Sequence, residues 1–537
     1  MWKIDGEQGA ECLKCQWDIV AYTRGVGLDI GCGPYKAFPH FIGIDNRKDV
    51  HMFGIQMNPD LTIPDATDMG IFASDKYDFV FSAHLLEHID DFKKALTEWW
   101  RLLKVGGHLN LYLPHKDFYP NIGVEGANPD HKHDFLPKDI INAMKDIGES
   151  WDLLVNDERN GTGCNGAEEY SFLQVFKKTD IKAHHQSWKN QKPKKTAALV
   201  RYGAFGDVIQ TASVASALKS QGYHVTFYCE TRGYEVAKED PSFDRFFIQD
   251  KDQVPNLRLG DFWKWEMRKY DKWVNLSESV EGSLLALPDR VEGLWPQAVR
   301  HKHMNINYLE FMHDIAGTQY QWFKDGQRFV PTEEEVAWAK AEKATNPGIV
   351  ISWALAGSSI HKVWPYIDVA FARLMEVTDA VVYTTGDATT VRLEAGWENE
   401  PRMKLRSGKW TMRQSLAFAQ QADIVVGPET GILNAVAYSK DVAKIVLMSH
   451  SSVENLTRDW YRTISLIPMN TSCYPCHRMH YSWETCRREE EGVSACQKDI
   501  SPDTMWTALC QYIGEEHFTD VSRRVEWKKA EAVSLGA

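Results

Sequence analysis

The fold is decided by a stretch that reads A-A-L-V-R-Y-G-A-F-G-D-V-I-Q-T, from Ala197 to Thr211. Its apolar start predicts a buried strand, Gly203 and Gly206 predict a tight turn, and the spacing that follows predicts a helix ending at Gly222. In an open α/β sheet, such a turn lies at the carboxyl end of a strand, where ligands bind. We therefore expect Asp207 to face a ligand cleft, and a helix-capping role for its carboxylate is the alternative of equal weight.

Composition indicates a globular protein of several domains. The chain has 537 residues, of which 43% are hydrophobic and 25% are charged. No apolar run approaches the ~18 residues that cross a bilayer, and the first residues lack the apolar core of a signal peptide, so we expect a cytoplasmic protein. The net charge of −13 argues against duplex nucleic acid as a partner, because such binding neutralises phosphates.

A second strand and glycine turn occurs near the start of the chain, where residues 25–35 read G-V-G-L-D-I-G-C-G-P-Y. Asp45 ends the next apolar run, F-I-G-I-D-N. Glycines admit a ligand close to the backbone, and a carboxylate at the end of the second strand accepts hydrogen bonds from ribose hydroxyls. The pattern predicts a nucleoside site, and the segments after it predict a continued alternation of strands and helices, βαβαβ.

Residues 20–175 resemble the class I S-adenosylmethionine-dependent methyltransferases, which implies that S-adenosylmethionine is the cofactor. The resemblance implies that the methionine end of the cofactor contacts Asp29, Gly31 and Gly33 and that its ribose contacts Asp45. It also implies that the adenine contacts Asp65 and Ala66 and that His84 lies beside the cofactor. Pro34-Tyr35 replaces the third glycine of the family pattern D-x-G-x-G-x-G.

A methyl acceptor needs a base or a pocket that positions its nucleophile. His131 and His133 lie in the loop N-P-D-H-K-H-D-F, and the corresponding region lines the acceptor pocket in similar methyltransferases, so we expect them to be catalytic. Surface loop histidines are an equal alternative. Two ligands in an H-x-H pair give only a weak indication of a metal site.

The second half of the chain alternates strands and helices again. It resembles glycosyltransferase family 9, the lipopolysaccharide heptosyltransferase family, over residues 196–515, which implies a GT-B pair of Rossmann-like domains. In that family, the aspartate at the position of Asp207 is the general base, and the lysine at the position of Lys362, in S-S-I-H-K-V-W-P, stabilises the leaving diphosphate. The loop G-P-E-T-G-I-L-N matches the family's phosphate loop.

The donor in this family is a nucleotide-diphosphate sugar. The implied donor-binding residues are Ser358, Ser359, Lys362, Gly386, Glu429, Thr430 and Gly431. Backbone amides and a lysine can stabilise the leaving diphosphate without a metal. Glu429 and Asn434 stand where the family has aspartate and histidine, so the donor need not be ADP-heptose.

The predicted domains are a methyltransferase domain, a basic linker, an acceptor domain, and a donor domain that ends in a helix. They span residues 1–180, 181–195, 196–345 and 346–537. A solvated tether is the favoured interpretation of the lysine-rich linker, and contact with an anionic membrane surface is the alternative.

Four cysteines cluster in the donor domain with the spacing C-x2-C-x9-C-x9-C. They are Cys473, Cys476, Cys486 and Cys496. In a cytosolic chain such a group favours structural zinc or packed thiols over disulfides, and thiols are the preferred interpretation here.

The sequence therefore predicts a bifunctional cytoplasmic transferase, peripheral at most to the inner membrane, that methylates a sugar or small molecule. Its second half would transfer a sugar with inversion to a glycan or glycolipid acceptor in surface polysaccharide synthesis. Two alternatives are a viral-type enzyme that glycosylates and methylates nucleic-acid bases, and a binding protein whose sites have lost activity. The oligomeric state stays open.

Overall fold

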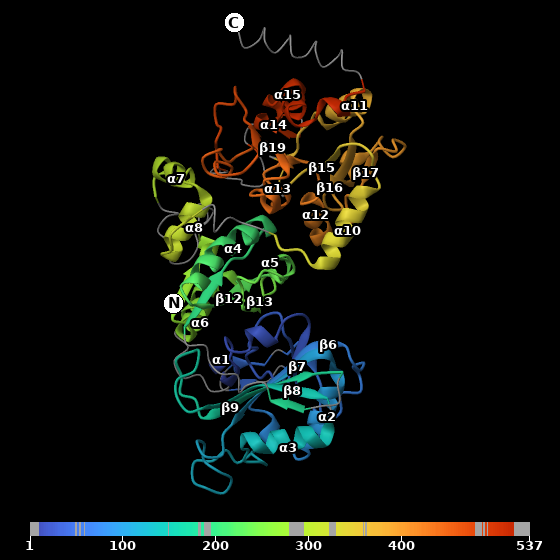
Figure 1. Ribbon diagram of the computed structural model, residues 1–537. Helices are drawn as coiled ribbons and strands as arrows, with labels where there is room; N and C mark the ends of the chain where they lie inside the picture. The colour runs from blue at the N-terminus through green and yellow to red at the C-terminus, as the bar shows by residue number, and fades with distance from the viewer. Residues whose placement is uncertain are drawn as a thin grey trace. The chain divides into compact units, whose positions relative to one another are not determined.

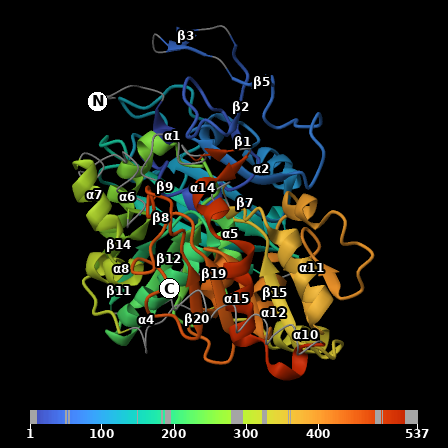
Figure 2. The same ribbon diagram turned by 90° about the horizontal axis from the view of Figure 1, so that it is seen from above.

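The structure is a computed structural model that describes residues 10–48, 51–52, 55–57, 59–148, 150–180, 184–186, 195–278, 295–321, 329–357, 359, 362–477, 486, 489–490 and 492–519. The chain divides into two compact units, shown in Figures 1 and 2. The first unit comprises residues 1–194 and 248–269, and the second comprises residues 195–247 and 270–537. Within the described residues, no helix has both the length and the apolar character needed to cross a membrane.

The first unit is built on an eight-stranded sheet with the order β10-β8-β9-β7-β6-β1-β2-β5. Its strands are parallel except for β9, which runs antiparallel to both of its neighbours. The bounds are β1 Gly27–Ile30, β2 Ile42–Asp45, β5 Leu61–Thr62, β6 Tyr77–Ala83, β7 Leu103–Pro114, β8 Trp151–Arg159, β9 Ser171–Lys178 and β10 His184–Gln186; β3 His51–Met52 and β4 Ile55–Gln56 form a small hairpin. β10 lies inside the predicted linker and extends this sheet.

The expected alternation of strands and helices is wrong for two connections of this sheet. Residues 31–41, between β1 and β2, form turns and bends, and so do residues 63–76, between β5 and β6. The first of these two connections is at the lower limit of length for a βαβ crossover, which needs ~10–12 residues including its helix and loops. Regular crossover helices appear only later, as α2 (Phe92–Leu102) and α3 (Pro137–Ile147).

Each face of this parallel sheet is covered in a different way. α2 and α3 pack together on one face, where they bury leucine and isoleucine side chains of β1 and β7 (Figure 1). On the other face, Phe79 of β6 contacts Phe41, with ring centroids 4.6 Å apart. Phe41 contacts Phe38, which contacts Trp17, which in turn contacts Phe262, at centroid distances of 5.5, 5.8 and 6.0 Å. These aromatic side chains thus cover the face on which the expected crossover helices are absent.

Phe262 belongs to α6 (Leu259–Glu266), in the segment 248–269 that comes from the middle of the sequence. This segment is anchored by the carboxylate of Asp18, which accepts hydrogen bonds from Trp265 Nε1 at 2.8 Å and Lys269 Nζ at 3.0 Å. Arg159 adds a third contact, at 2.7 Å. The first unit therefore includes a helix that is encoded far from its other elements.

The second unit contains two parallel sheets. The first has the order β13-β12-β11-β14 and the second has the order β17-β16-β15-β18-β19-β20. The bounds are β11 Thr196–Val200, β12 His224–Cys229, β13 Arg245–Ile248, β14 Lys272–Asn275, β15 Val350–Ala354, β16 Val381–Thr385, β17 Met403–Leu405, β18 Ile424–Pro428, β19 Ala443–Leu447 and β20 Thr463–Leu466, and β21 Glu489–Glu490 pairs with β22 Val493–Ser494. Every strand of β15–β20 is buried, at least in part, as expected for a parallel sheet between helical layers.

Helices cover both faces of the six-stranded sheet. α11 (Ile367–Val377) and α15 (Pro502–Tyr512) bury one set of side chains with Ile351 and Trp353 of β15. α12 (Met412–Ala419) and α13 (Gly431–Val436) pack with Val350 and Ala354 on the opposite face. The other α-helices among the described residues are α1 Glu11–Lys14, α4 Phe205–Ser220, α5 Thr231–Ala237, α7 Gln297–Met304, α8 Tyr308–Ala316, α10 Glu333–Ala344 and α14 Ala495–Asp499.

Candidate functional sites

The predicted nucleoside site lies at the carboxyl ends of β1 and β2. Gly31 and Gly33 both have positive φ angles, +75° and +57°, and a Cβ atom on Gly31 would lie 2.6 Å from the Leu85 side chain. Asp45 closes the turn, because its carboxylate accepts a hydrogen bond from Gly33 N at 3.1 Å. Asp29 lies beneath the turn, where burial raises the pKa of its carboxyl to about 7. The structure thus brings four predicted cofactor residues together.

The predicted adenine residues lie in a loop that is tied to α2. Ala66 O accepts a hydrogen bond from Trp99 Nε1 at 3.0 Å. Asp65 is exposed, and the backbone hydrogen bond from Thr67 N, 2.8 Å long, lowers the pKa of its carboxyl. These contacts fix the loop at the end of the sheet beside β2, whose neighbour is β5.

His84 follows β6 and has a left-handed backbone, with φ +48°. Its Nε2 lies 2.9 Å from the Ser171 hydroxyl, and burial lowers the pKa of its imidazole to about 4. The ring is therefore neutral at physiological pH. A strained backbone at a buried polar residue is a pattern found at functional sites.

The two loop histidines of the predicted acceptor site differ in their surroundings. His133 Nε2 contacts the carbonyl oxygens of Ile89 and Asp90 at 3.0 and 3.1 Å, which is a structural role. His131 is buried, and its Nε2 lies 4.0 Å from Glu87 Oε1. The H-x-H pair therefore points its two rings at different partners.

Sequence reasoning missed Glu87, which lies between His84 and His88 in the segment H-L-L-E-H. Its side chain is completely buried, and burial raises the pKa of its carboxyl to about 8. His84 Nδ1 and His88 Nε2 each lie 3.9 Å from Glu87 Oε1. In the sequence, the available signal for a role of Glu87 was a carboxylate that stands among closely spaced histidines.

In the second unit, Asp207 lies in the first turn of α4, and Ala204 occupies the N-cap position. Its Oδ2 forms an ion pair with Arg201, 2.9 Å away, and the Arg201 guanidinium also donates to the Tyr308 hydroxyl at 2.9 Å. Arg201, the residue after β11, was not singled out from the sequence. The arginine fixes the orientation of the Asp207 carboxylate.

The glycines at the starts of α4 and α13 lie against each other. A Cβ atom on Gly206 would lie 3.2 Å from Gly431 Cα and 2.7 Å from Asn434 Nδ2, and one on Gly431 would lie 2.0 Å from the Phe205 ring. Gly206 therefore serves helix packing inside α4, and the expected tight turn depends on Gly203, whose φ is +109°. The approach brings the start of the Asp207 helix to the phosphate-loop motif.

Three predicted donor residues follow neighbouring strands of the six-stranded sheet. Lys362 comes after β15, Gly386 directly follows β16 and Glu429 directly follows β18. Lys362 Nζ donates a hydrogen bond to Glu429 O, 2.5 Å away, so the lysine already lies at the phosphate-loop motif. A Cβ atom on Gly386 would lie 2.1 Å from Thr390 Oγ1, which explains the glycine.

The Glu429 carboxylate is buried and turned toward Ser449. It accepts hydrogen bonds from Ser449 N at 2.8 Å, from Ser451 N at 3.2 Å and from the Ser449 hydroxyl. Burial raises the pKa of this carboxyl, and Lys362 opposes that rise. Ser449 was missed, and its place just beyond β19 was the only signal for it.

The other predicted donor residues surround this group. Ser359 O accepts a hydrogen bond from Lys362 N at 3.0 Å. The Thr430 hydroxyl is buried, and no described residue forms a hydrogen bond with it. Gly431 is discussed above, and Ser358 lies outside the described residues.

The predicted cysteine cluster stays a prediction. Burial raises the pKa of the Cys496 thiol to about 12. Cys473 is exposed, and all four cysteines are free of disulfide bonds. Among the described residues, the side chains close enough to share a metal ion are Glu87, His88 and His131, and not these cysteines.

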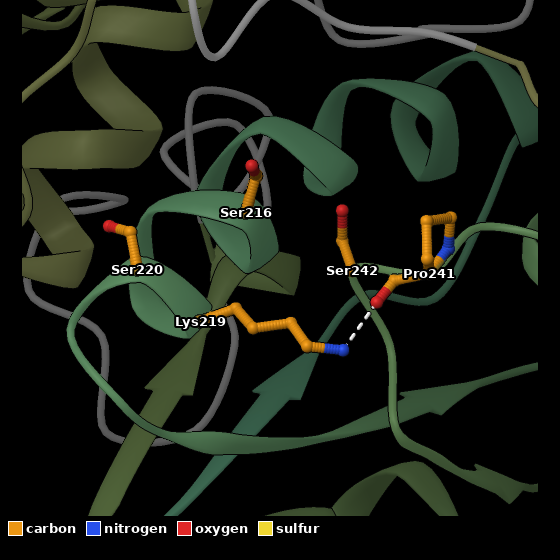
Figure 3. Close-up of a pocket in the computed structure, with 5 residues that line it drawn as sticks. All are labelled: Ser216, Lys219, Ser220, Pro241 and Ser242. Atoms are coloured by element: carbon orange, nitrogen blue, oxygen red, sulfur yellow. Dashed lines mark hydrogen bonds between the residues drawn. The ribbon is translucent and has the colours of Figure 1, made fainter.

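A surface pocket in the second unit, shown in Figure 3, lies away from the predicted residues. It is lined by Ser216, Lys219, Ser220, Pro241 and Ser242. The lysine donates to Pro241 O, the dashed contact of Figure 3, and forms an ion pair with Asp244 at 2.8 Å. Its charge is therefore already compensated, and none of the predicted site residues lines this pocket.

Comparisons with known proteins find a family match and similar solved structures. Residues 28–111 match the methyltransferase domain family. A comparison with curated proteins gives no match. The structure of a glycosyl transferase family 9 protein from Veillonella parvula is 15% identical with a TM-score of 0.43, and it covers 60% of this chain and 98% of its own.

Two further structures are similar. E. coli ADP-heptose lps heptosyltransferase II is 12% identical with a TM-score of 0.41, and it covers 60% of this chain and 99% of its own. A SAM dependent methyltransferase from Archaeoglobus fulgidus is 15% identical with a TM-score of 0.24, and it covers 31% of this chain and 92% of its own. The predicted α/β class is confirmed by the parallel sheets described above. Residues 28–111 therefore match a methyltransferase domain, within a mixed α/β architecture.

Proposed function

We propose that this protein is a bifunctional transferase. The first unit transfers a methyl group from S-adenosylmethionine to a sugar or small molecule, and the second transfers a sugar from a nucleotide-diphosphate donor, with inversion, to a glycan or glycolipid acceptor. The observation that carries the glycosyl-transfer proposal is the hydrogen bond from Lys362 Nζ to the carbonyl oxygen of Glu429, the residue that directly follows β18. Gly386 directly follows β16, which pairs with β15 in the same parallel sheet. Ligands of open α/β sheets bind at this edge.

Methyl transfer is supported by the family match together with the glycine turn and Asp45. The glycine turn follows β1, and the carboxylate of Asp45, at the end of β2, lies at the position where ribose hydroxyls are bound in such folds. S-adenosylmethionine would supply the methyl group, and the residues of this chain would bind and orient it. The neutral His84 and the pair His131 and Glu87 would border the methyl acceptor.

Replacing Asp45 by Ala is expected to weaken S-adenosylmethionine binding by roughly 10- to 150-fold, because a hydrogen bond to a charged group contributes ~1.5–3 kcal/mol. Calorimetry with the full chain measures the change. Asp78→Ala is the matched control, because that carboxylate binds Val26 N and Lys104 at the opposite end of the sheet. An affinity unchanged in Asp45→Ala would contradict the cofactor assignment.

Glycosyl transfer is supported by the chemistry of the second site. Departure of a nucleoside diphosphate leaves negative charge on an oxygen atom, which the Lys362 ammonium and backbone amides at Thr430 and Gly431 would stabilise. The unpaired, buried Thr430 hydroxyl supports a ligand at this position, because buried polar groups nearly always have a partner. Asp207 would accept the proton of the acceptor hydroxyl.

Replacing Lys362 by Ala is expected to weaken binding of a nucleoside diphosphate by roughly 10- to 150-fold and to lower turnover as well, since its charge contacts both the bound and the leaving diphosphate. Titration with ADP, UDP and GDP measures the binding. Lys343→Ala is the control, because Lys343 pairs with Asp423 at 2.6 Å, at the other end of the sheet. Equal affinities in both variants would refute the role of Lys362.

We also propose a cytoplasmic location, with at most peripheral contact at the inner membrane. The proposed pathway is the synthesis of lipopolysaccharide or another surface polysaccharide. A thermal-shift panel of nucleoside diphosphates and S-adenosylhomocysteine on the full chain tests both activities, because a ligand that binds the native state raises its melting temperature. Shifts with these ligands but no turnover would favour a binding protein with inactive sites, and no shift with either class would contradict both proposed sites. A nucleic-acid base modifier would instead bind single-stranded oligonucleotides.

A further inference from the structure

We propose that Glu87, His88 and His131 form a binding site for a divalent transition-metal ion of the zinc or iron(II) class. Glu87 and His88 lie on one 3₁₀ helix, Leu86–His88, and His131 lies on the loop that follows β7. The site is in the first unit and is distinct from the cysteine cluster of the second. It also differs from the H-x-H pair, because Glu87 and His88 replace His133.

Geometry supports a shared ion. The ligand atoms of the three side chains all lie within 4.8 Å of one another, with Glu87 Oε1 3.9 Å from His88 Nε2 and 4.0 Å from His131 Nε2. Metal–ligand bonds of ~2.0–2.2 Å in a tetrahedral site separate neighbouring ligand atoms by about 3.4 Å. To bind the ion, the two Glu87–histidine separations would shorten by about half an ångström each, and the histidine nitrogens, at most 4.8 Å apart, would approach by up to about 1.4 Å.

The Glu87 carboxylate supplies an independent observation. The side chain is fully buried, and both of its oxygen atoms lack a hydrogen-bond partner among the described residues. Burying a carboxylate without partners is costly, and buried charges are normally paired or bound to a metal. The histidine nitrogens at 3.9–4.0 Å are too distant to form hydrogen bonds with it. A cation between them would satisfy the carboxylate.

The surrounding contacts hold the ligands in place. Lys132 N and His133 N donate hydrogen bonds to Glu87 O at 2.7 and 3.2 Å, so the loop that carries His131 is attached to the backbone of Glu87. His88 has a hydrogen bond with the backbone of Asp130. Metal-binding histidines usually use their second ring nitrogen in this way, which orients the first toward the ion.

The donor set indicates the class of ion. Two imidazoles and one carboxylate match zinc sites that keep an open position, and also the iron(II) sites of two histidines and one carboxylate. Magnesium and calcium prefer oxygen ligands and are disfavoured here. The open position would accept an oxygen atom of the methyl acceptor beside His84. This role of the ion rests on the proposed methyl transfer, whereas the proposal that the site binds a metal does not depend on it.

Cobalt(II) provides the test, because its visible spectrum reports ligand type and geometry. The full chain, prepared with Cys473, Cys476, Cys486 and Cys496 replaced by Ser, is titrated with cobalt(II) and then with zinc(II) by calorimetry. We expect one bound ion with a spectrum typical of nitrogen and oxygen ligands. Glu87→Gln and His131→Asn should each lower the affinity by at least about 100-fold, since even residues that only orient metal ligands contribute 10- to 100-fold.

His133→Asn is the matched control, because the His133 ring contacts the carbonyl oxygens of Ile89 and Asp90. The metal affinity of this variant should stay close to that of the parent. An affinity lost equally in His133→Asn, or a parent protein with no cobalt spectrum, would overturn the site. Melting temperatures measured without metal show whether each variant is folded. If Glu87→Gln does not fold, His131→Asn, a substitution in a loop, provides the test of the site. S-adenosylhomocysteine binding, measured separately, tests the proposed methyl transfer and not the metal site.

Discussion

Turnover of a nucleotide-diphosphate sugar is expected to fall by about 10²- to 10⁴-fold in Asp207→Asn, with little change in donor affinity. Asparagine keeps the shape of the side chain but cannot take the proton of the acceptor hydroxyl. Arg201 makes this loss sharper, because it holds the carboxylate in one orientation at 2.9 Å, and a neutral amide loses that ion pair as well. The measurement is release of nucleoside diphosphate in the presence of EDTA, since the leaving group is proposed to need no metal.

Loss of an ion pair alone must be separated from loss of the base. Asp244→Asn provides the comparison, because Asp244 also pairs with a cation, Lys219 at 2.8 Å, and its side chain is 22% exposed against 23% for Asp207. Its partner Lys219 lines the pocket of Figure 3, which none of the predicted site residues lines. Comparable turnover in the two variants, or complete loss on chelation, would reject the mechanism.

The largest effect on stability is expected for Asp18→Ala, which should lower the free energy of unfolding of the first unit by ~3–5 kcal/mol. The substitution leaves Arg159 and Lys269 without their shared carboxylate and removes the acceptor for Trp265 Nε1. Denaturant unfolding, followed by far-ultraviolet circular dichroism, measures the loss. Asp78→Ala removes a more exposed ion pair, with Lys104. Loss of this pair should lower the free energy of unfolding by at most ~1 kcal/mol, apart from the effect of losing the hydrogen bond from Val26 N.

The same carboxylate predicts a dependence on pH. Burial alone would raise the pKa of Asp18, but the charges of Lys269 and Arg159 lower it to about 2, from an unfolded value of 3.8. Its contribution to stability is therefore complete above the unfolded value and is lost as the pH falls toward 2. In Asp18→Ala this part of the acid dependence should disappear. An unchanged acid transition in the variant would contradict the assignment.

Local patterns predicted the elements that hold the sites. Buried apolar runs followed by glycine turns located β1 and β11, because a parallel strand and its turn are specified by neighbouring residues. The predicted positions of Asp45, Lys362 and Glu429 at strand ends follow from the same logic. Their catalytic and binding roles stay predictions.

Other features depend on contacts between distant residues, which no local pattern encodes. The pairing of Glu87 with His131 requires a loop to return over the 3₁₀ helix, and the pairing of Gly206 with Gly431 requires two helix starts to meet. The packing of Phe262 on Trp17 could not be predicted, because α6 reads as an ordinary amphipathic helix of the second half.

The segment 248–269 also sets an order of events during synthesis on the ribosome. The first unit lacks Trp265 and Lys269 until well after residue 194 has been added, so its aromatic face stays uncovered while the next strands are made. At 5–20 residues per second, this interval lasts on the order of 4–15 s. A nascent chain halted before Lys269 has emerged would therefore expose Trp17 and Asp18, and would offer chaperones an apolar surface that the finished protein hides.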